Sequence, residues 1–271
     1  MDSANQDIAL ATLPQGDRRW LGSAHLLCTT RSGGVSRGAY ASNNLALHVD
    51  DSADEVVQNR TQLIDNKELL EIQWLNQVHG VRVLGVRTVE EPAPTADAMF
   101  TTRPGTGLAI LTADCLPVVL ADSRGELVAA AHAGWRGLCA GILSKLVAAL
   151  PVPAPRLQAF IGPAIGQAAF EVGPDVVQAL DSYGLDTDVV SQRKLDTRGR
   201  VVADKYQVDL VLAARLDLAR AGVTQVSGGH WCTFTDQRFY SWRRETQRTK
   251  GQGASPVTGR QATIIWLPQP E

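Results

Sequence analysis

The sequence predicts a single-domain protein of the α/β class (α+β type), with layered mixed β-sheets flanked by helices. Three segments, 107–113, 117–121 and 127–131, are nearly continuous runs of Val, Ile, Leu and Ala, a pattern typical of strands covered on both faces. Segments with helical spacing of apolar residues occur among the strand-like runs, and no linker divides the 271 residues. We therefore expect an N-terminal extension over residues 1–19 and one domain over residues 20–271.

The other strands are predicted from short apolar runs bounded by turn-forming residues. They occupy residues 24–30, 72–76, 81–86, 157–162, 238–242 and 262–267. Ser52 and Glu55 form a capping box at the start of the first helix, and Gly222 ends the last one. The predicted helices cover residues 53–70, 134–150, 174–184 and 208–219. The polar stretch 187–204 is expected to be irregular.

Composition favours a protein that acts on small molecules. With 26 basic and 28 acidic residues the net charge is −2, so there is no strong field to attract nucleic acid or an anionic membrane. No apolar stretch approaches the roughly 18 residues of a membrane span, and the first residues lack the pattern of a signal peptide, so we expect a cytoplasmic protein. The four cysteines lie far apart without a C-x-x-C pair, which argues against a disulfide framework.

Reactive side chains follow three of the predicted strands. His79, the pair Asp114 and Cys115, and His132 each come after an apolar run. In sheets with helical cover, ligands bind outside the carboxyl ends of strands. The three strand ends therefore predict one shared cleft.

Two kinds of chemistry fit these side chains. Two imidazoles and one thiolate, from His79, His132 and Cys115, can hold a catalytic zinc ion and leave a fourth position for water or substrate. Alternatively, Cys115 is a nucleophile, one of the histidines is its base, and Asp114 or Arg136 lies nearby. A purely structural role for all of them is the third possibility. Spacing alone leaves the three interpretations open.

Several motifs, in order over roughly residues 20–267, resemble one known family. They are TTRSGGVSRGAYASNNL, NQVHG, ADAMFTTRPGTGLAILTADCLPVVL, AAHAGWRG, IGPAIGQAAFEVG, and FYSWRRE followed by TGRQA. This family is described as multicopper polyphenol oxidase-like (laccase-domain) proteins, as peptidoglycan editing factor and as purine nucleoside phosphorylase. The resemblance implies a single catalytic domain of layered sheets, usually a monomer, with a metal site at His79, Cys115 and His132. Zinc is the metal it implies, and copper is an alternative.

The resemblance also implies activities on small molecules. These are phosphorolysis of adenosine, inosine, guanosine and methylthioadenosine, deamination of adenosine, and polyphenol oxidation as a side activity. The alternatives are an amidase that removes wrongly incorporated L-serine from peptidoglycan precursors, and a non-catalytic metal- or ligand-binding module. A four-copper laccase mechanism is disfavoured, because a blue-copper centre alone uses two histidines and the chain has only five.

Five polar residues are candidates for substrate binding. Arg136 lies just inside the predicted start of a helix, where free N–H groups favour anions. Arg31 precedes a glycine pair and is a second candidate for an anion. Ser42 and Asn44 are candidate hydrogen-bond donors to a ribose or another sugar. The family pattern places the segment of Arg243 near the site.

Asp114 is expected to orient His79 or His132 through a hydrogen bond, which would fix the tautomer of the ring. Cys232 and Arg244 are left undecided between a place in the cleft and a structural role. The remaining histidines and cysteines are interpreted as structural, namely His25, His48, His230, Cys28 and Cys139.

Overall fold

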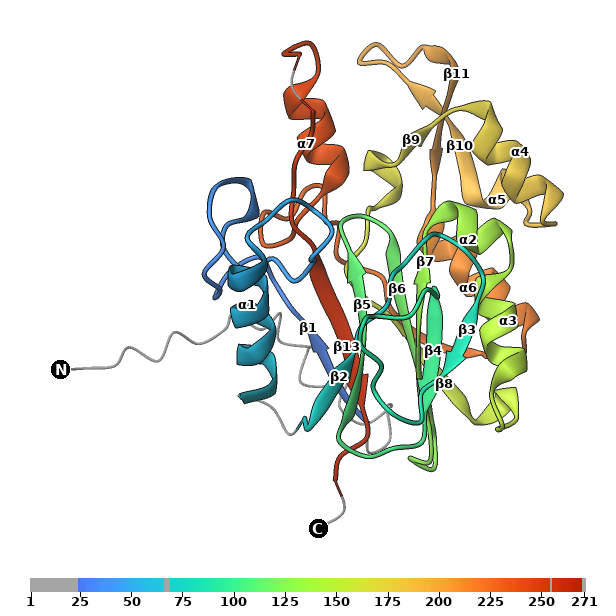
Figure 1. Ribbon diagram of the computed structural model, residues 1–271. Helices are drawn as coiled ribbons and strands as arrows, with labels where there is room; N and C mark the ends of the chain where they lie inside the picture. Colours follow the sequence, from blue (N-terminus) through green and yellow to red (C-terminus); the bar gives the residue numbers. More distant parts are fainter. Residues whose placement is uncertain (1–23, 66–68, 254, 270–271) are drawn as a thin grey trace.

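The computed structural model describes residues 24–65, 69–253 and 255–269, and it confirms the predicted class of fold. Two β-sheets are stacked face to face, helices cover their outer faces, and a small third sheet projects at one end (Figure 1). The expected N-terminal extension, residues 1–19, lies outside the described residues.

The larger sheet has six strands in the order β12-β8-β6-β7-β4-β3. β6 is antiparallel to both β7 and β8, and every residue of β6 and β7 is buried, as the apolar runs predict. Two strands of this sheet, β4 and β12, were not expected from the sequence. The bounds are β3 (Val83–Gly85), β4 (Ala98–Thr101), β6 (Leu116–Asp122), β7 (Val128–Ala133), β8 (Leu157–Ile161) and β12 (Gln225–Gly228).

The smaller sheet has four strands in the order β1-β13-β5-β2. Its inner face packs on the larger sheet through fully buried side chains, among them Leu108, Ile110, Val119 and Phe160. Residues 113–115 carry the chain from β5 in this sheet directly to β6 in the other. The bounds are β1 (His25–Cys28), β2 (Glu71–Gln73), β5 (Thr106–Thr112) and β13 (Gln261–Trp266).

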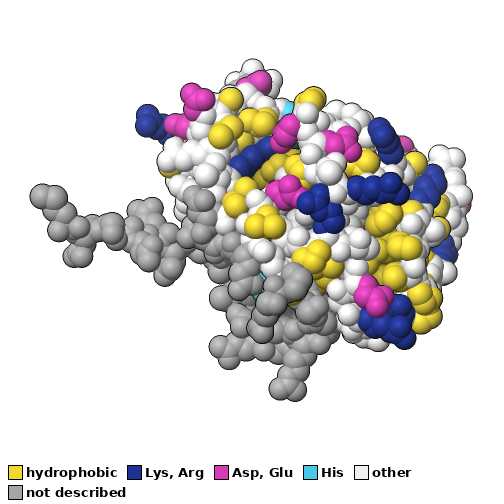
Figure 2. Space-filling view, turned by 60° about the horizontal axis from the view of Figure 1, so that its bottom comes forward, with side chains coloured by type: hydrophobic (Ala, Val, Ile, Leu, Met, Phe, Trp, Pro, Cys, Tyr) yellow, Lys and Arg dark blue, Asp and Glu magenta, His cyan; other side chains and the backbone are white. Residues whose placement is uncertain are grey.

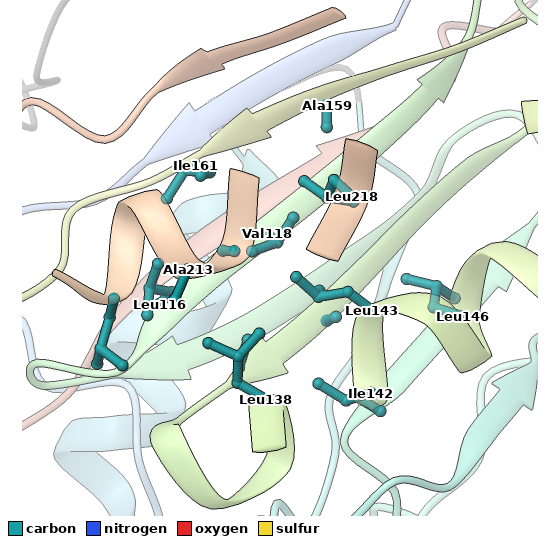
Figure 3. Close-up of a cluster of buried hydrophobic side chains, with 14 of the residues drawn as sticks. Leu116, Val118, Leu138, Ile142, Leu143, Leu146, Ala159, Ile161, Ala213 and Leu218 are labelled. Carbon is teal, nitrogen blue, oxygen red and sulfur yellow. The ribbon is translucent and has the colours of Figure 1, made fainter. Parts of the chain in front are cut away.

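Helices cover the outer faces of both sheets. Helix α1 (Ala53–Asp65) packs on the four-stranded sheet through Leu63. Helices α3 (Ile142–Ala149) and α6 (Leu210–Arg220) pack on the six-stranded sheet, where Leu143 and Leu218 lie in one cluster with side chains of β6 and β8 (Figure 3). The order of layers is therefore helix, sheet, sheet, helix.

The third sheet corrects the expectation that residues 187–204 are irregular. They contain α5 (Thr187–Val190), β10 (Ser191–Leu195) and the start of β11 (Val201–Val208), and β11 also pairs with β9 (Glu171–Val172). The hairpin of β10 and β11 follows α4 (Pro174–Ser182), a helix that the sequence predicts correctly. The hairpin was missed because most of its side chains are exposed or half-buried, so its sequence shows no clear apolar alternation.

Three further boundaries differ from expectation. The helix expected at 134–150 is two helices, α2 (Trp135–Cys139) and α3, because Gly141 adopts a left-handed φ of 82° between them. The strand expected at 238–242 does not form. A helix, α7 (Trp242–Thr249), begins there instead, and the Ser241 side chain caps it by accepting from the N–H of Arg244. The described part of the first helix runs to Asp65, and residues 69 and 70, which were expected to belong to it, are not helical.

The surface is of mixed character. On the face shown in Figure 2, acidic and basic side chains are interspersed with apolar ones, in keeping with the net charge of −2. Among the helices of the described residues, none has the length and apolar character that crossing a bilayer requires.

Candidate metal centre

The structure brings His79, Cys115 and His132 together at the junction of the two sheets. Their ligand atoms all lie within 4.8 Å of one another, and Cys115 Sγ is 3.8 Å from His79 Nε2. The imidazole rings meet edge to face, with centroids 4.7 Å apart. The predicted convergence is thus present, although the positions differ in detail: Cys115 immediately precedes β6, and His132 lies within β7, which continues to Ala133.

The three side chains fit a metal ion. In a tetrahedral site with zinc bond lengths of about 2.0–2.3 Å, sulfur and nitrogen ligand atoms are about 3.6 Å apart, close to the 3.8 Å between Cys115 and His79. His132 uses Nδ1 for another contact, which leaves Nε2 for an ion. His132 is buried, Cys115 is half-buried and His79 is exposed, so the cluster opens to solvent on the His79 side.

Gly134 provides the space in which the cluster lies. A Cβ atom at this position would be 2.9 Å from His79 Cδ2 and 3.0 Å from Cys115 Sγ. Both distances are too short for ordinary carbon contacts, so a larger residue would displace two of the three ligands. The glycine just after β7 is therefore part of the site.

Asp97, which the sequence analysis missed, holds two of the three ligands. Its carboxylate accepts the Nδ1–H of His132 at 2.9 Å, and it also accepts the backbone N–H groups of His79 at 2.9 Å, Gly80 at 2.7 Å and Val78 at 3.2 Å. His79 has a left-handed φ of 59°, which is uncommon for a residue with a side chain and is held by these contacts.

Asp97 therefore has the orienting role that was expected of Asp114. The carboxylate of Asp114 accepts instead from Thr233 Oγ1 at 2.6 Å and from the backbone N–H of Arg243 at 2.7 Å. The sequence signal for Asp97 is an aspartate directly before the apolar residues of β4. Burial alone would raise the pKa of Asp97, but the hydrogen bonds from His132 and from the N–H of Gly80 lower it below its usual range.

The electrostatics of the cluster favour a thiolate. Burial alone would raise the pKa of Cys115, but the charges and hydrogen bonds of His132 and His79 outweigh it and lower that pKa to about 6. Burial likewise opposes charge on His132, and the Cys115 thiolate and the Asp97 carboxylate raise the pKa of His132 to about 9. A deprotonated thiol is the form that binds metals and acts as a nucleophile.

The titration of Cys115 in metal-free protein follows from this arrangement. We expect the ultraviolet absorbance of thiolate to rise through a midpoint near pH 6, because the thiol loses its proton above its pKa. The step should disappear in Cys115→Ser and shift to higher pH in His132→Asn, while Cys139→Ser should keep it. A low-pH step that persists in Cys115→Ser would contradict the assignment.

The predicted substrate-binding residues differ in their exposure and in the contacts that they make. Arg136 is exposed on the short helix α2, with its guanidinium carbon 4.3 Å from the centre of the Trp135 ring. Arg243 is linked to Asp114 through its backbone N–H, and its Nη1 donates to a backbone carbonyl. Arg31 is half-buried, its Nε donates to the carbonyl of Ala41, and its guanidinium lies 5.0 Å from the centre of the Tyr240 ring.

Ser42 and Asn44 are engaged within the protein. Ser42 Oγ donates to the carbonyl of Arg31 and accepts from the N–H of Gly34. Asn44 is completely buried, its Nδ2 donates to the Ala46 carbonyl and to Asp51, and its Oδ1 accepts two backbone N–H groups. Asn44 therefore has no exposed amide for a ribose, and its contacts fix the loop in which it lies.

The two undecided residues both have structural contacts. Cys232 Sγ accepts the N–H of Gly166 at 3.2 Å, and Cys232 is not one of the three clustered ligands. Arg244 donates through Nη1 to the carbonyls of Thr233 and Phe234 and thereby holds the loop before α7.

The fold and the cluster together define a layered α/β protein with a candidate three-ligand metal centre. The chain belongs to the family described as multi-copper polyphenol oxidoreductase laccase, whose model matches residues 25–268.

Named relatives and solved structures agree with this assignment. Purine nucleoside phosphorylase PA4543 of Pseudomonas aeruginosa is 43% identical over 88% of this chain and 91% of its own length. Purine nucleoside phosphorylase YfiH of Escherichia coli is 41% identical over 88% of this chain and 92% of its own. The crystal structure of Neisseria meningitidis protein NMB0706 superposes with a TM-score of 0.82 at 38% identity, covering 92% of this chain and 97% of that one.

Proposed function

We propose that this protein is a metal-dependent enzyme that cleaves purine nucleosides by phosphorolysis. The observation that carries the proposal is the cluster of His79, Cys115 and His132, in a chain whose relatives are named purine nucleoside phosphorylases. The proposed substrates are adenosine, inosine, guanosine and methylthioadenosine, and deamination of adenosine is proposed at the same centre.

The residues of the cluster would hold a zinc ion, with copper as the alternative. A bound zinc ion would supply Lewis acidity toward an oxygen atom of substrate or water. Asp97 keeps the proton of His132 on Nδ1, so that Nε2 faces the cluster. Arg31, Arg136 and Arg243 are proposed to contact the charged and polar parts of the substrate, together with Ser42.

The second substrate of the proposed phosphorolysis is hydrogen phosphate. A phosphate oxygen forms a bond to C1′ of the ribose while the bond from C1′ to the purine nitrogen breaks. The electron pair of the broken bond stays on that nitrogen, which takes up the proton of the phosphate. The products are ribose 1-phosphate and the free purine.

A second candidate is an amidase in which Cys115 attacks a muramyl-peptide precursor and releases wrongly incorporated L-serine. The observation that favours it is the pairing of the Cys115 thiol with His132, which lowers the pKa of the thiol to about 6. A serine-containing precursor and its alanine counterpart test this directly. Release of serine that is lost in Cys115→Ser would support the amidase, and no release from either precursor would exclude it.

The main test combines metal content with turnover. We expect purified wild-type protein to contain zinc and to release purine from inosine only when phosphate is present. In Cys115→Ala and His79→Ala both the zinc content and the turnover should fall by at least about a hundredfold, because each variant removes one of three ligands. Cys139→Ala and His230→Ala are matched controls outside the cluster. Unchanged turnover in both ligand variants would refute the proposal.

A further inference from the structure

Arg260 is held in one position by the strands and loops around it. Its backbone N–H donates to Asn44 Oδ1 at 2.9 Å, and its carbonyl accepts the N–H of Leu45 at 3.2 Å. A Cβ atom on the preceding Gly259 would lie 2.8 Å from Cζ of the Tyr240 ring and 3.0 Å from Asn44 Cβ. The chain therefore passes between these two buried residues in a way that only glycine allows, and Arg260 follows immediately.

The guanidinium of Arg260 is fixed along one edge. Its Nη1 donates to the carbonyls of Thr258 at 2.9 Å and Gly259 at 3.0 Å, and the side chain is partly buried. Within the described part of the chain, it forms no ion pair with a carboxylate. Its Cζ lies 5.9 Å from the centre of the Trp242 ring, and Trp242 is 45% exposed. A partly desolvated cation thus stands beside an exposed aromatic ring.

Strand pairing places Arg260 beside the candidate metal centre. Gln261, which follows Arg260, pairs with Thr112 at the end of β5, and Asp114 and Cys115 come two and three residues after Thr112. Burial lowers the pKa of Arg260, and the negative charges of Cys115, Asp114 and Tyr40 oppose this lowering. Asp114 does not neutralise the guanidinium directly, since its oxygens accept from Thr233 and Arg243. A desolvated cation without a bonded counter-ion is costly in free energy, and an anionic ligand would relieve that cost.

We propose that Arg260 binds the phosphate that attacks the nucleoside, with the remaining N–H groups of its guanidinium directed at the phosphate oxygens. This inference rests on the proposed function. A rigid guanidinium fork matches the oxygens of phosphate, and its one fixed edge reduces the entropy lost on binding. Arg136 is less suited to this role because it is exposed and lies on a helix of five residues. In this proposal Asn44 holds the backbone of Arg260 in place and does not contact the ribose.

Steady-state kinetics of the zinc-loaded enzyme test the assignment. In Arg260→Gln we expect the KM for phosphate to rise about tenfold or more while the KM for inosine changes little, because a charge-assisted contact to one substrate is lost. Arg260→Lys keeps the charge without the fork and should give a smaller increase. Arg215→Gln is the matched control, since Arg215 also donates to two backbone carbonyls but lies on α6. An unchanged KM for phosphate in Arg260→Gln would overturn the inference.

Calorimetric titration with inorganic phosphate, without nucleoside, separates this inference from the proposed function. Phosphate that binds wild type and Arg215→Gln but binds Arg260→Gln at least about tenfold more weakly supports the site, even if no phosphorolysis is found. Phosphorolysis with a KM for phosphate that does not depend on Arg260 leaves the function intact and refutes the site. If wild type neither binds phosphate nor cleaves inosine, both proposals fail.

Discussion

Gly134→Ala is expected to abolish most metal binding while leaving the fold intact. The added methyl group would lie 2.9 Å from His79 Cδ2 and 3.0 Å from Cys115 Sγ, so it would push both ligand side chains out of their present positions. The backbone of Gly134 has φ −65° and ψ 160°, a conformation that alanine adopts without strain. We expect metal affinity and turnover to fall by about 10–100-fold, the range seen when ligand orientation is disturbed.

Metal competition titrations and thermal unfolding of the metal-free protein measure the two parts of this prediction. Gly85→Ala is the control, because its methyl group would also meet a side chain, the ring of Phe100 at 3.2 Å, but on the edge strand β3. We expect normal metal affinity in Gly85→Ala. A Gly134→Ala protein that binds a full equivalent of zinc with wild-type affinity would show that the space at this glycine has no role.

The fold was predictable where burial leaves a strong pattern. The runs that form β5, β6 and β7 are nearly continuously apolar because these strands lie between other layers, so their sequence alone identifies them. The hairpin of β10 and β11 is mostly exposed, and backbone pairing without an apolar face leaves little trace in the sequence. The helix boundary at Ser241 was missed because the apolar run around it also fits a strand.

The site was predictable to the extent that residue type determines chemistry. His79, Cys115 and His132 stand out because imidazole and thiolate groups follow apolar runs. Asp97 does not stand out, since its partners come from the 78–80 loop and from β7, and only the folded chain brings them together. Asn44 shows the opposite error: it looks like a ligand-binding amide in the sequence, yet its hydrogen bonds are used inside the protein.

The cation that we propose for the phosphate differs from the one that the sequence favoured, for a structural reason. The sequence favoured Arg136 because a long helix was expected to start beside it. The helix α2 that forms there ends at Cys139, so the alignment of peptide dipoles is short. Arg260 precedes β13, and nothing in its local sequence shows that the loop packs against Asn44 and Tyr240.

Asp97→Asn is expected to weaken both the fold and the metal centre. In the wild type, Asp97 Oδ1 accepts from His79 N–H and His132 Nδ1–H, and Oδ2 accepts from the N–H groups of Val78 and Gly80. An asparagine amide has only one oxygen, so in either orientation its NH₂ group faces two donors. Each buried donor that loses its partner costs about 1–3 kcal/mol, so the free energy of unfolding should fall measurably.

The loss of metal affinity distinguishes Asp97 from other buried carboxylates. Without an acceptor on Nδ1, His132 loses the contact that fixes its ring, and the His79 loop loses its anchor, so we expect affinity for zinc to fall by about 10–100-fold. Asp122→Asn is the matched control, because Asp122 is equally buried and is bonded to Arg156, but it lies at the opposite end of β6 from Cys115. Urea unfolding and zinc competition titrations of both variants separate the two effects. Both should lose stability, and only Asp97→Asn should lose zinc; equal zinc affinity in the two variants would refute a positioning role for Asp97.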